Sequence, residues 1–244
     1  MIRRSGSAPG PRMPRRLLAA AVLLALLGPV AARDERPGVG DAPGEGHGPG
    51  VGDAPGDFDF YVLALSWSPS YCEAQRDRAN PDQCEAGRPY AFVVHGLWPQ
   101  YERGYPERCG GPRRLPPDLI ESVLDIMPSR SLVRHEWEVH GTCSGLSPGR
   151  YFETVRRAYE TVSIPPAFRR LDAPAVTTPA DVERQFIAAN PGLGPDMVTV
   201  TCDRTRLRDV RICLNRDLRF RACSDAARQA CRRPEVRLPP LRGR

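Results

Sequence analysis

Short runs of apolar and aromatic residues near both ends of the chain predict buried β-strands by their length and composition. The expected strands cover residues 58–67, 90–94, 197–202, 210–214 and 218–222. The second of these strands would deliver His95 at its end. Polar stretches interrupted by Gly and Pro, at 73–89 and 96–112, predict loops.

In the middle of the chain, apolar residues recur three and four positions apart, which is the spacing of one helix face. The expected helices cover residues 116–127, 132–142, 151–162 and 178–190. Helices in the middle with strands at both ends indicate an α+β domain.

The first 32 residues have the pattern of a cleaved signal peptide. Five arginines and no acidic residue precede the apolar run Leu17–Leu27, and small residues follow at 30–32. The run is too short to span a bilayer comfortably, which argues against a membrane anchor. The residues around Arg15 and Arg16 do not support a twin-arginine signal. We expect ordinary secretion, to the periplasm or out of the cell, with no membrane association after cleavage.

Composition sets the expected domain boundaries. Residues 33–56 are dominated by Gly, Pro, Ala and Asp, and they contain the same heptapeptide at 38–44 and 50–56. Such a segment lacks the apolar residues that would offset its ordering entropy, so it should be a flexible spacer. We expect one folded domain over 57–233, followed by a Pro- and Arg-rich tail, 234–244, that is disordered.

The formal net charge of +6 overstates how basic the exported protein is. Without the five arginines of the leader, 30 arginines remain against 29 acidic residues, and the chain contains no lysine. This balance does not support a general nucleic-acid-binding protein that acts through charge alone.

All eight cysteines follow the leader, at positions 72, 84, 109, 143, 202, 213, 223 and 231. An even number of cysteines behind an export signal indicates disulfide bonds. A zinc ribbon would need close Cys-x-x-Cys pairs, and the chain has none. Spacing alone leaves the pairing open.

Three of the four histidines fall in two short segments, which makes these segments the candidate site. His135 and His140 are five positions apart, about 140° around a helix, whereas the zinc-protease motif needs histidines four apart on one face. A metal site is therefore not expected.

Glu136 and His140 are four positions apart and should share a helix face. A carboxylate beside an imidazole would raise the pKa of His140 and suit it to proton exchange at mildly acidic pH. With His95 as a second proton-transfer group, two histidines can support displacement at phosphorus without a metal, provided that the substrate carries its own nucleophile. The 2′-hydroxyl of RNA is such a nucleophile.

Two segments carry a family resemblance: Phe92-Val-Val-His-Gly-Leu-Trp-Pro99 and His135-Glu-Trp-Glu-Val-His-Gly-Thr-Cys143. They resemble the active-site segments of the ribonuclease T2 family of secreted acid ribonucleases, and 65–72 resembles a further family stretch. The resemblance covers roughly 58–231 and is much weaker in the C-terminal third. It implies an α+β fold around an antiparallel sheet, and a monomeric endoribonuclease that cleaves single-stranded RNA with little base specificity.

The resemblance also implies a role for each site residue. His140 would be the general base, His95 the general acid, His135 would bind the phosphate, and Glu136 would stabilise the five-coordinate phosphorus. Trp98 would stack on a base. The reaction would pass through a 2′,3′-cyclic phosphate, with no metal, cofactor or obligate protein partner. The implied disulfides are Cys72–Cys84, Cys109–Cys143, Cys202–Cys231 and Cys213–Cys223.

One departure from the family pattern lowers the expected activity. The family usually has a lysine where this chain has Val139, and that cation stabilises negative charge in the transition state. The second hypothesis is therefore a catalytically weak relative that binds RNA or another partner; a zinc hydrolase is a distant third. Taken singly, His95 or His135 could be structural histidines and Trp98 a core residue.

Overall fold

The computed structural model describes residues 54–75, 80–85, 87–224 and 229–242. The expected signal peptide and the spacer as far as residue 53 lie outside the described residues. Within the part described, no helix is long and apolar enough to cross a membrane.

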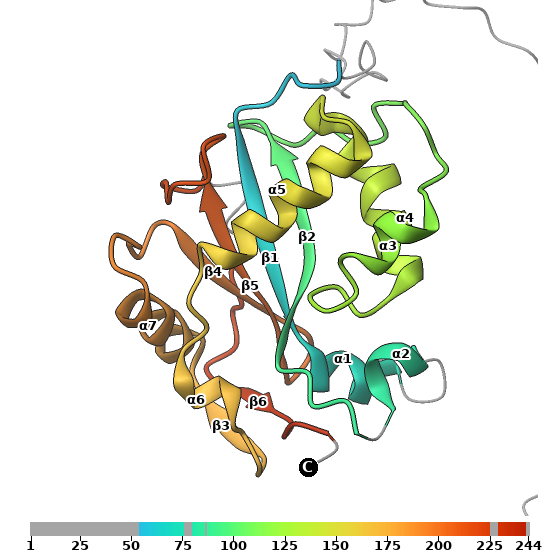
Figure 1. Ribbon diagram of the computed structural model, residues 1–244. Helices are drawn as coiled ribbons and strands as arrows, with labels where there is room; N and C mark the ends of the chain where they lie inside the picture. The colour runs from blue at the N-terminus through green and yellow to red at the C-terminus, as the bar shows by residue number, and fades with distance from the viewer. Residues whose placement is uncertain (1–53, 76–79, 86, 225–228, 243–244) are drawn as a thin grey trace, which may run out of the picture. The chain divides into compact units, whose positions relative to one another are not determined.

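A four-stranded antiparallel sheet forms the centre of the domain (Figure 1). Its strands are β1 (Phe60–Trp67), β2 (Phe92–Gln100), β4 (Val198–Cys202) and β5 (Leu207–Leu214). They lie in the order β2-β1-β5-β4, so the first strand of the domain pairs with a strand from near its end. This architecture agrees with the expected α+β class.

The two faces of the sheet point into different hydrophobic clusters. Leu63, Leu65 and Trp67 of β1 point into the main hydrophobic core. The alternate residues Phe60 and Val62 point to the opposite face, where they form a small separate cluster with Cys213. Because side chains alternate along a strand, the polar Ser66 also belongs to this second face, which is here called the open face.

Helices cover the face that points into the main core, and local sequence determines where these helices end. They are α3 (Pro117–Glu121), α4 (Arg130–Val139), α5 (Pro148–Glu160), α6 (Pro166–Arg169) and α7 (Pro179–Ala189). Helix α5 crosses in front of β1 and β2, and α3 and α4 lie beyond β2 (Figure 1). The hydroxyl of Ser129 caps α4 by accepting from the Leu132 N–H at 3.2 Å, and Thr178 caps α7 in the same way.

Several expectations about single elements are wrong. The expected loop over 73–89 contains the end of α1 (Ser68–Gln75) and α2 (Pro81–Cys84), and the expected loop over 96–112 begins as strand. The expected helix over 116–127 continues after Glu121 only as turns. Residues 218–222 form no strand, only an isolated bridge between Leu214 and Phe220.

The end of the chain is also more ordered than expected. Strand β6 (Val236–Leu238) pairs with β3 (Ala175–Thr177), and Val236, Leu238 and Leu241 are buried in the core. Composition alone predicted disorder here because Pro and Arg separate the apolar residues that the core takes up.

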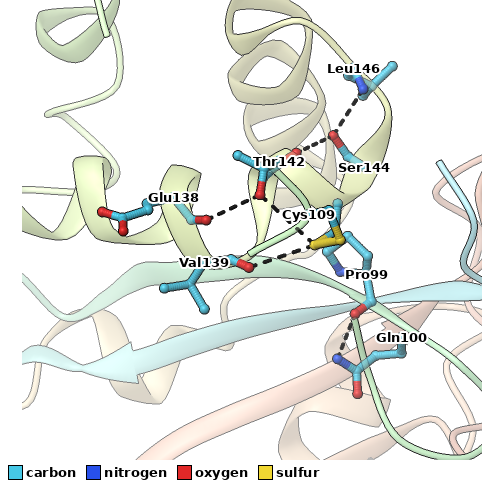
Figure 2. The surroundings of a disulfide bond; sticks show 10 residues. Pro99, Gln100, Cys109, Glu138, Val139, Thr142, Ser144 and Leu146 are labelled. Carbon is cyan, nitrogen blue, oxygen red and sulfur yellow. Dashed lines mark hydrogen bonds between the residues drawn. A yellow bond between two sulfur atoms is a disulfide. The ribbon is translucent and has the colours of Figure 1, made fainter. Parts of the chain in front are cut away.

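Four disulfides fasten the domain: Cys72–Cys84, Cys109–Cys143, Cys202–Cys231 and Cys213–Cys223. They are the same four pairs that the family resemblance implies. Cys109–Cys143 joins the loop after β2 to the segment after α4 (Figure 2).

Candidate active site on the open face of the sheet

A β-bulge in β2 places His95. Ala64 pairs with Gly96 and Leu65 with Val94, so His95 has no partner of its own on β1. A bulge shifts the alternation of side chains by one position. Val94 before the bulge and Leu97 after it both enter the core, which leaves His95 and Trp98 on the open face. His95 therefore lies within the strand and not at its end, which corrects the expectation.

Neighbouring strands add polar side chains to the same face. Ser66 of β1 is the cross-strand partner of Asp209 on β5, and Asp209 in turn is paired with Thr201 on β4. Arg211, two positions after Asp209, points the same way because Val210 and Ile212 enter the core. The open face thus carries a carboxylate close to His95 and, farther along β5, the guanidinium of Arg211 over the Trp98 ring.

Helix α4 brings the second segment to this face. His135 is exposed near the middle of the helix, Glu136 is buried, and His140 caps the C-terminal end. The Arg108 N–H donates to the Val139 carbonyl at 2.8 Å, and the Cys109–Cys143 disulfide fixes the turn that follows. Figure 2 shows this disulfide beside Val139 and close to Pro99 of β2. The position of His140 is therefore set from both sides.

Glu136 reaches across to β2. Its Oε2 accepts a hydrogen bond from Trp98 Nε1–H at 2.7 Å, and its Oε1 lies 3.6 Å from His95 Nε2. This approach depends on Gly96, because a Cβ there would lie 2.0 Å from Glu136 Oε2. Burial raises the pKa of Glu136 to about 7, although the charge of His95 and the Trp98 bond act in the opposite direction.

His95 lies between two carboxyl groups. Its Nε2 faces Glu136, while its Nδ1 lies 3.3 Å from Ser66 Oγ and 3.7 Å from Asp209 Oδ1. Burial alone would lower the pKa of His95, but the interaction with Asp209 and the charge of Glu136 outweigh burial, so the pKa is raised. The imidazolium form is favoured.

His140 has the opposite environment, and one expectation is wrong here. The predicted Glu136–His140 pair does not form, because Glu136 turns to Trp98 and His95. Burial lowers the pKa of His140 to about 3, and the charges of His135 and His95 add to the effect. The neutral imidazole form of His140 is therefore favoured above about pH 3.

Two cavities open beside these residues. The first, of about 430 Å³, is lined by His95 and His135 together with Tyr71, Gln83 and Leu132. The second, of about 270 Å³, is lined by Trp98, Val139, His140 and Arg211. The centre of the Trp98 ring lies 5.4 Å from the ring centres of both His95 and His140, so Trp98 packs against both histidines.

Sequence reasoning missed Ser66, Asp209 and Arg211. The strand that carries the last two was expected to begin only at Val210, whereas β5 begins at Leu207. The alternation of polar 209 and 211 with apolar 210 and 212 was the available signal. Among the described residues, no three His, Cys, Asp or Glu side chains are grouped in a way that could hold a metal ion.

The fold is an α+β domain around an antiparallel sheet, and its candidate site holds two histidines whose pKa values are shifted in opposite directions. Comparisons with known proteins give the family. Residues 58–223 match the model of the Ribonuclease T2 family, and the chain belongs to this family. A ribonuclease from Aeromonas hydrophila is 54% identical over 91 residues, which are 37% of this chain and only 40% of that protein.

Two further proteins are similar over a greater length. A ribonuclease T2 protein of Caenorhabditis elegans is 28% identical over 190 residues, 68% of this chain and 67% of that protein. The solved structure of an RNase-related protein from Calystegia sepium has a TM-score of 0.60 at 23% identity, and the match covers 75% of this chain and 97% of that one. The expected fold is confirmed.

Proposed function

We propose that this protein is an exported endoribonuclease that cleaves single-stranded RNA by attack of the 2′-hydroxyl, without a metal. The observation that carries the proposal is the contrast between the two histidines: His95 lies between the carboxyl groups of Glu136 and Asp209, whereas the buried Nδ1 of His140 has no hydrogen-bond partner among the described residues. Accordingly the pKa of His95 is raised and that of His140 is lowered. Groups whose pKa values are moved apart in one site are suited to serve as base and acid at the same pH. Family membership supports RNA as the substrate.

In the first step, neutral His140 takes the proton of the 2′-hydroxyl as the 2′-oxygen forms a bond to phosphorus. The bond from phosphorus to the 5′-oxygen breaks, and His95 gives its proton to that oxygen. The products are a 2′,3′-cyclic phosphate and a free 5′-hydroxyl. Water then opens the cyclic phosphate in a slower second step, with the two histidines in exchanged roles.

The raised pKa of Glu136 has a direct use in this reaction. Burial raises the pKa of Glu136 to about 7, so its carboxyl group takes up a proton at a higher pH than an ordinary glutamate, while the charge of His95 acts against this. A protonated carboxyl can donate a hydrogen bond to a phosphoryl oxygen, whereas a carboxylate would repel it. His135, exposed beside the first cavity, would bind the same phosphate, and Trp98 would stack on a base.

The second candidate function, a binding protein with little catalysis, rests on Val139. This apolar residue lines the second cavity, so no cation stands at its position. Arg211 lines the same cavity and places its Cζ 5.1 Å from the centre of the Trp98 ring. We assign to Arg211 the charge stabilisation that a lysine at 139 would give, and this favours the enzyme over the binding protein.

The test is digestion of single-stranded RNA at pH 5 in excess EDTA, with the products analysed for 2′,3′-cyclic phosphate ends. We expect cleavage in EDTA by the unaltered protein and by His47→Ala, a control at the histidine that belongs to neither candidate segment. His95→Ala and His140→Ala should each lose most of the activity. Loss of cleavage in EDTA would overturn the two-histidine mechanism, and no cleavage with or without metal would favour the binding protein.

A further inference from the structure

Asp209 is a completely buried carboxylate directly behind His95. Its Oδ1 accepts a hydrogen bond from Ser66 Oγ–H at 2.6 Å, and its Oδ2 accepts from Thr201 Oγ1–H at 3.1 Å and Arg208 Nε–H at 3.0 Å. Its side chain is only 1% exposed. A buried charge is costly unless it is paired and hydrogen-bonded, and these donors together with His95 meet that requirement.

The hydrogen-bond directions show that His95 Nδ1, the nitrogen that faces Ser66 and Asp209, carries a proton. The Ser66 hydroxyl has a single proton, and it is donated to Asp209. Ser66 Oγ can therefore only accept in its 3.3 Å contact with His95, so the donor is Nδ1–H. The result is a chain from Nδ1–H through Ser66 to Asp209, in addition to the 3.7 Å contact between Nδ1 and Asp209.

We propose that Asp209, acting through Ser66 and directly, is the positioning residue for His95. The pair fixes the imidazole ring with Nδ1–H directed at the sheet, so that Nε2 on the Glu136 side is the nitrogen that gives up its proton. This inference rests on the proposed function, because it assumes that His95 is the general acid. It gives a role to a buried carboxylate that lies on the Nδ1 side of His95, away from Glu136.

The interactions also determine how His95 titrates. The charged and titratable groups around His95 are Asp209 and Arg208 from β5, Glu136 from α4, and the imidazoles of His135 and His140. The pKa of Asp209 is lowered, since its contacts with His95, Ser66 and Arg208 outweigh the effect of burial, so it stays ionised. Without that charge His95 should lose its proton at a lower pH.

A purely structural role is the alternative, because Asp209 also connects β5 to β4 through Thr201. Two substrates separate the roles. One is a dinucleotide, whose 5′-oxygen needs a proton to leave. The other is a nucleoside 3′-(p-nitrophenyl phosphate), whose leaving group departs without one. A residue that acts through the general acid matters for the first substrate and little for the second.

We therefore expect Asp209→Asn to lower kcat/KM for the dinucleotide by about 10- to 100-fold, the size seen when a hydrogen-bond partner that orients a metal-binding histidine is removed. The loss of kcat/KM on the p-nitrophenyl substrate should be small, on the order of threefold or less, because its leaving group needs no general acid. Ser66→Ala should follow the same pattern with a smaller loss. Thr201→Val, which removes only the link to β4, should leave the ratio of the two substrates unchanged.

An NMR titration of His95 gives a readout that does not depend on activity. Its pKa should fall in Asp209→Asn and stay unchanged in Thr201→Val. Equal losses on both substrates, or an unchanged His95 pKa, would overturn the positioning role. If His95→Ala itself lost both substrates equally, the general-acid assignment in the proposed function would be wrong instead. Should Asp209→Asn fail to fold, Ser66→Ala decides by the same two measurements.

Discussion

The indole Nε1–H of Trp98 donates a 2.7 Å hydrogen bond to Glu136 Oε2 and so ties the sheet to helix α4. One bond thereby fixes a ring that packs against both histidines and a carboxyl group that faces His95. Both residues belong to segments that sequence alone marked as the site, but their contact with each other follows only from the fold.

Loss of this bond should destabilise the protein in a pH-dependent way. Trp98→Phe keeps an aromatic ring but removes the donor, so a buried carboxylate loses its partner at a cost of about 1 to 3 kcal/mol. Because the pKa of Glu136 is about 7, the carboxyl group is neutral at pH 5 and charged at pH 8. Urea unfolding should therefore show a larger loss of stability at pH 8 than at pH 5. Equal losses at the two pH values would contradict this account.

Glu136 should also make the folded state less stable as pH rises. Its pKa is about 7 when folded and close to the ordinary glutamate value of 4.5 when unfolded, so between these values the folded chain holds a proton that the unfolded chain has released. Stability contributed by this group is present below pH 4.5 and is lost as pH rises to 7.

Glu136→Gln removes that dependence. Relative to the unaltered protein, the free energy of unfolding of this variant should increase by about 1 to 3 kcal/mol between pH 4.5 and 7. Glu138→Gln, two positions along α4 at a half-exposed carboxylate paired with Arg108, should show no such increase. A parallel pH dependence for Glu136→Gln and the unaltered protein would mean that Glu136 titrates normally.

Gly96 should tolerate no side chain. A Cβ there would meet Glu136 Oε2 at 2.0 Å and Trp98 Nε1 at 2.3 Å, so Gly96→Ala must break their bond or displace β2. We expect a loss of about 1 to 3 kcal/mol, which is typical of overpacking, together with a fall in ribonuclease activity. Gly149→Ala in α5 is the matched control, because a Cβ at that position meets nothing within 4 Å. Thermal unfolding and the RNA digest measure both effects.

Arg211 should carry the charge stabilisation that Val139 cannot. Arg211→Gln should lower kcat for RNA by roughly 10²-fold, which is the effect of removing one donor to a developing oxyanion. Val139→Lys in the Arg211→Gln background should restore part of that loss, since both residues line the same cavity. Arg219→Gln, an exposed arginine paired with Asp217, should have no effect. Failure of Arg211→Gln to lower kcat would remove Arg211 from the reaction.

The sequence indicated the candidate site residues more fully than it indicated the contacts among them. His95, His135, Glu136 and His140 were identifiable because motif spacing survives without knowledge of the fold. The Glu136–His140 pair was wrong because helix periodicity shows which residues share a face, but not which nearby strand competes for them. Here the Trp98 indole of β2 takes the carboxyl group.

Long-range pairing explains most of the remaining differences. Asp209 lies 143 positions from its partner Ser66, and no local pattern links the two. Strand β6 likewise depends on its pairing with β3, so a Pro-rich segment with only three large apolar residues gave no sign of order. The bulge at His95 is visible only in the register between β1 and β2.

The pH dependence of kcat/KM for RNA, measured in EDTA, tests the central claim most directly. This ratio reports the essential acid and base of the free enzyme. With the pKa of His140 at about 3 and that of His95 raised, activity should rise through pH 3 and fall only above the ordinary histidine pKa of 6.5. The fall should move to lower pH in Asp209→Asn. Activity that needs added metal, or that rises only above pH 6.5, would contradict a neutral His140 base working with a charged His95 acid.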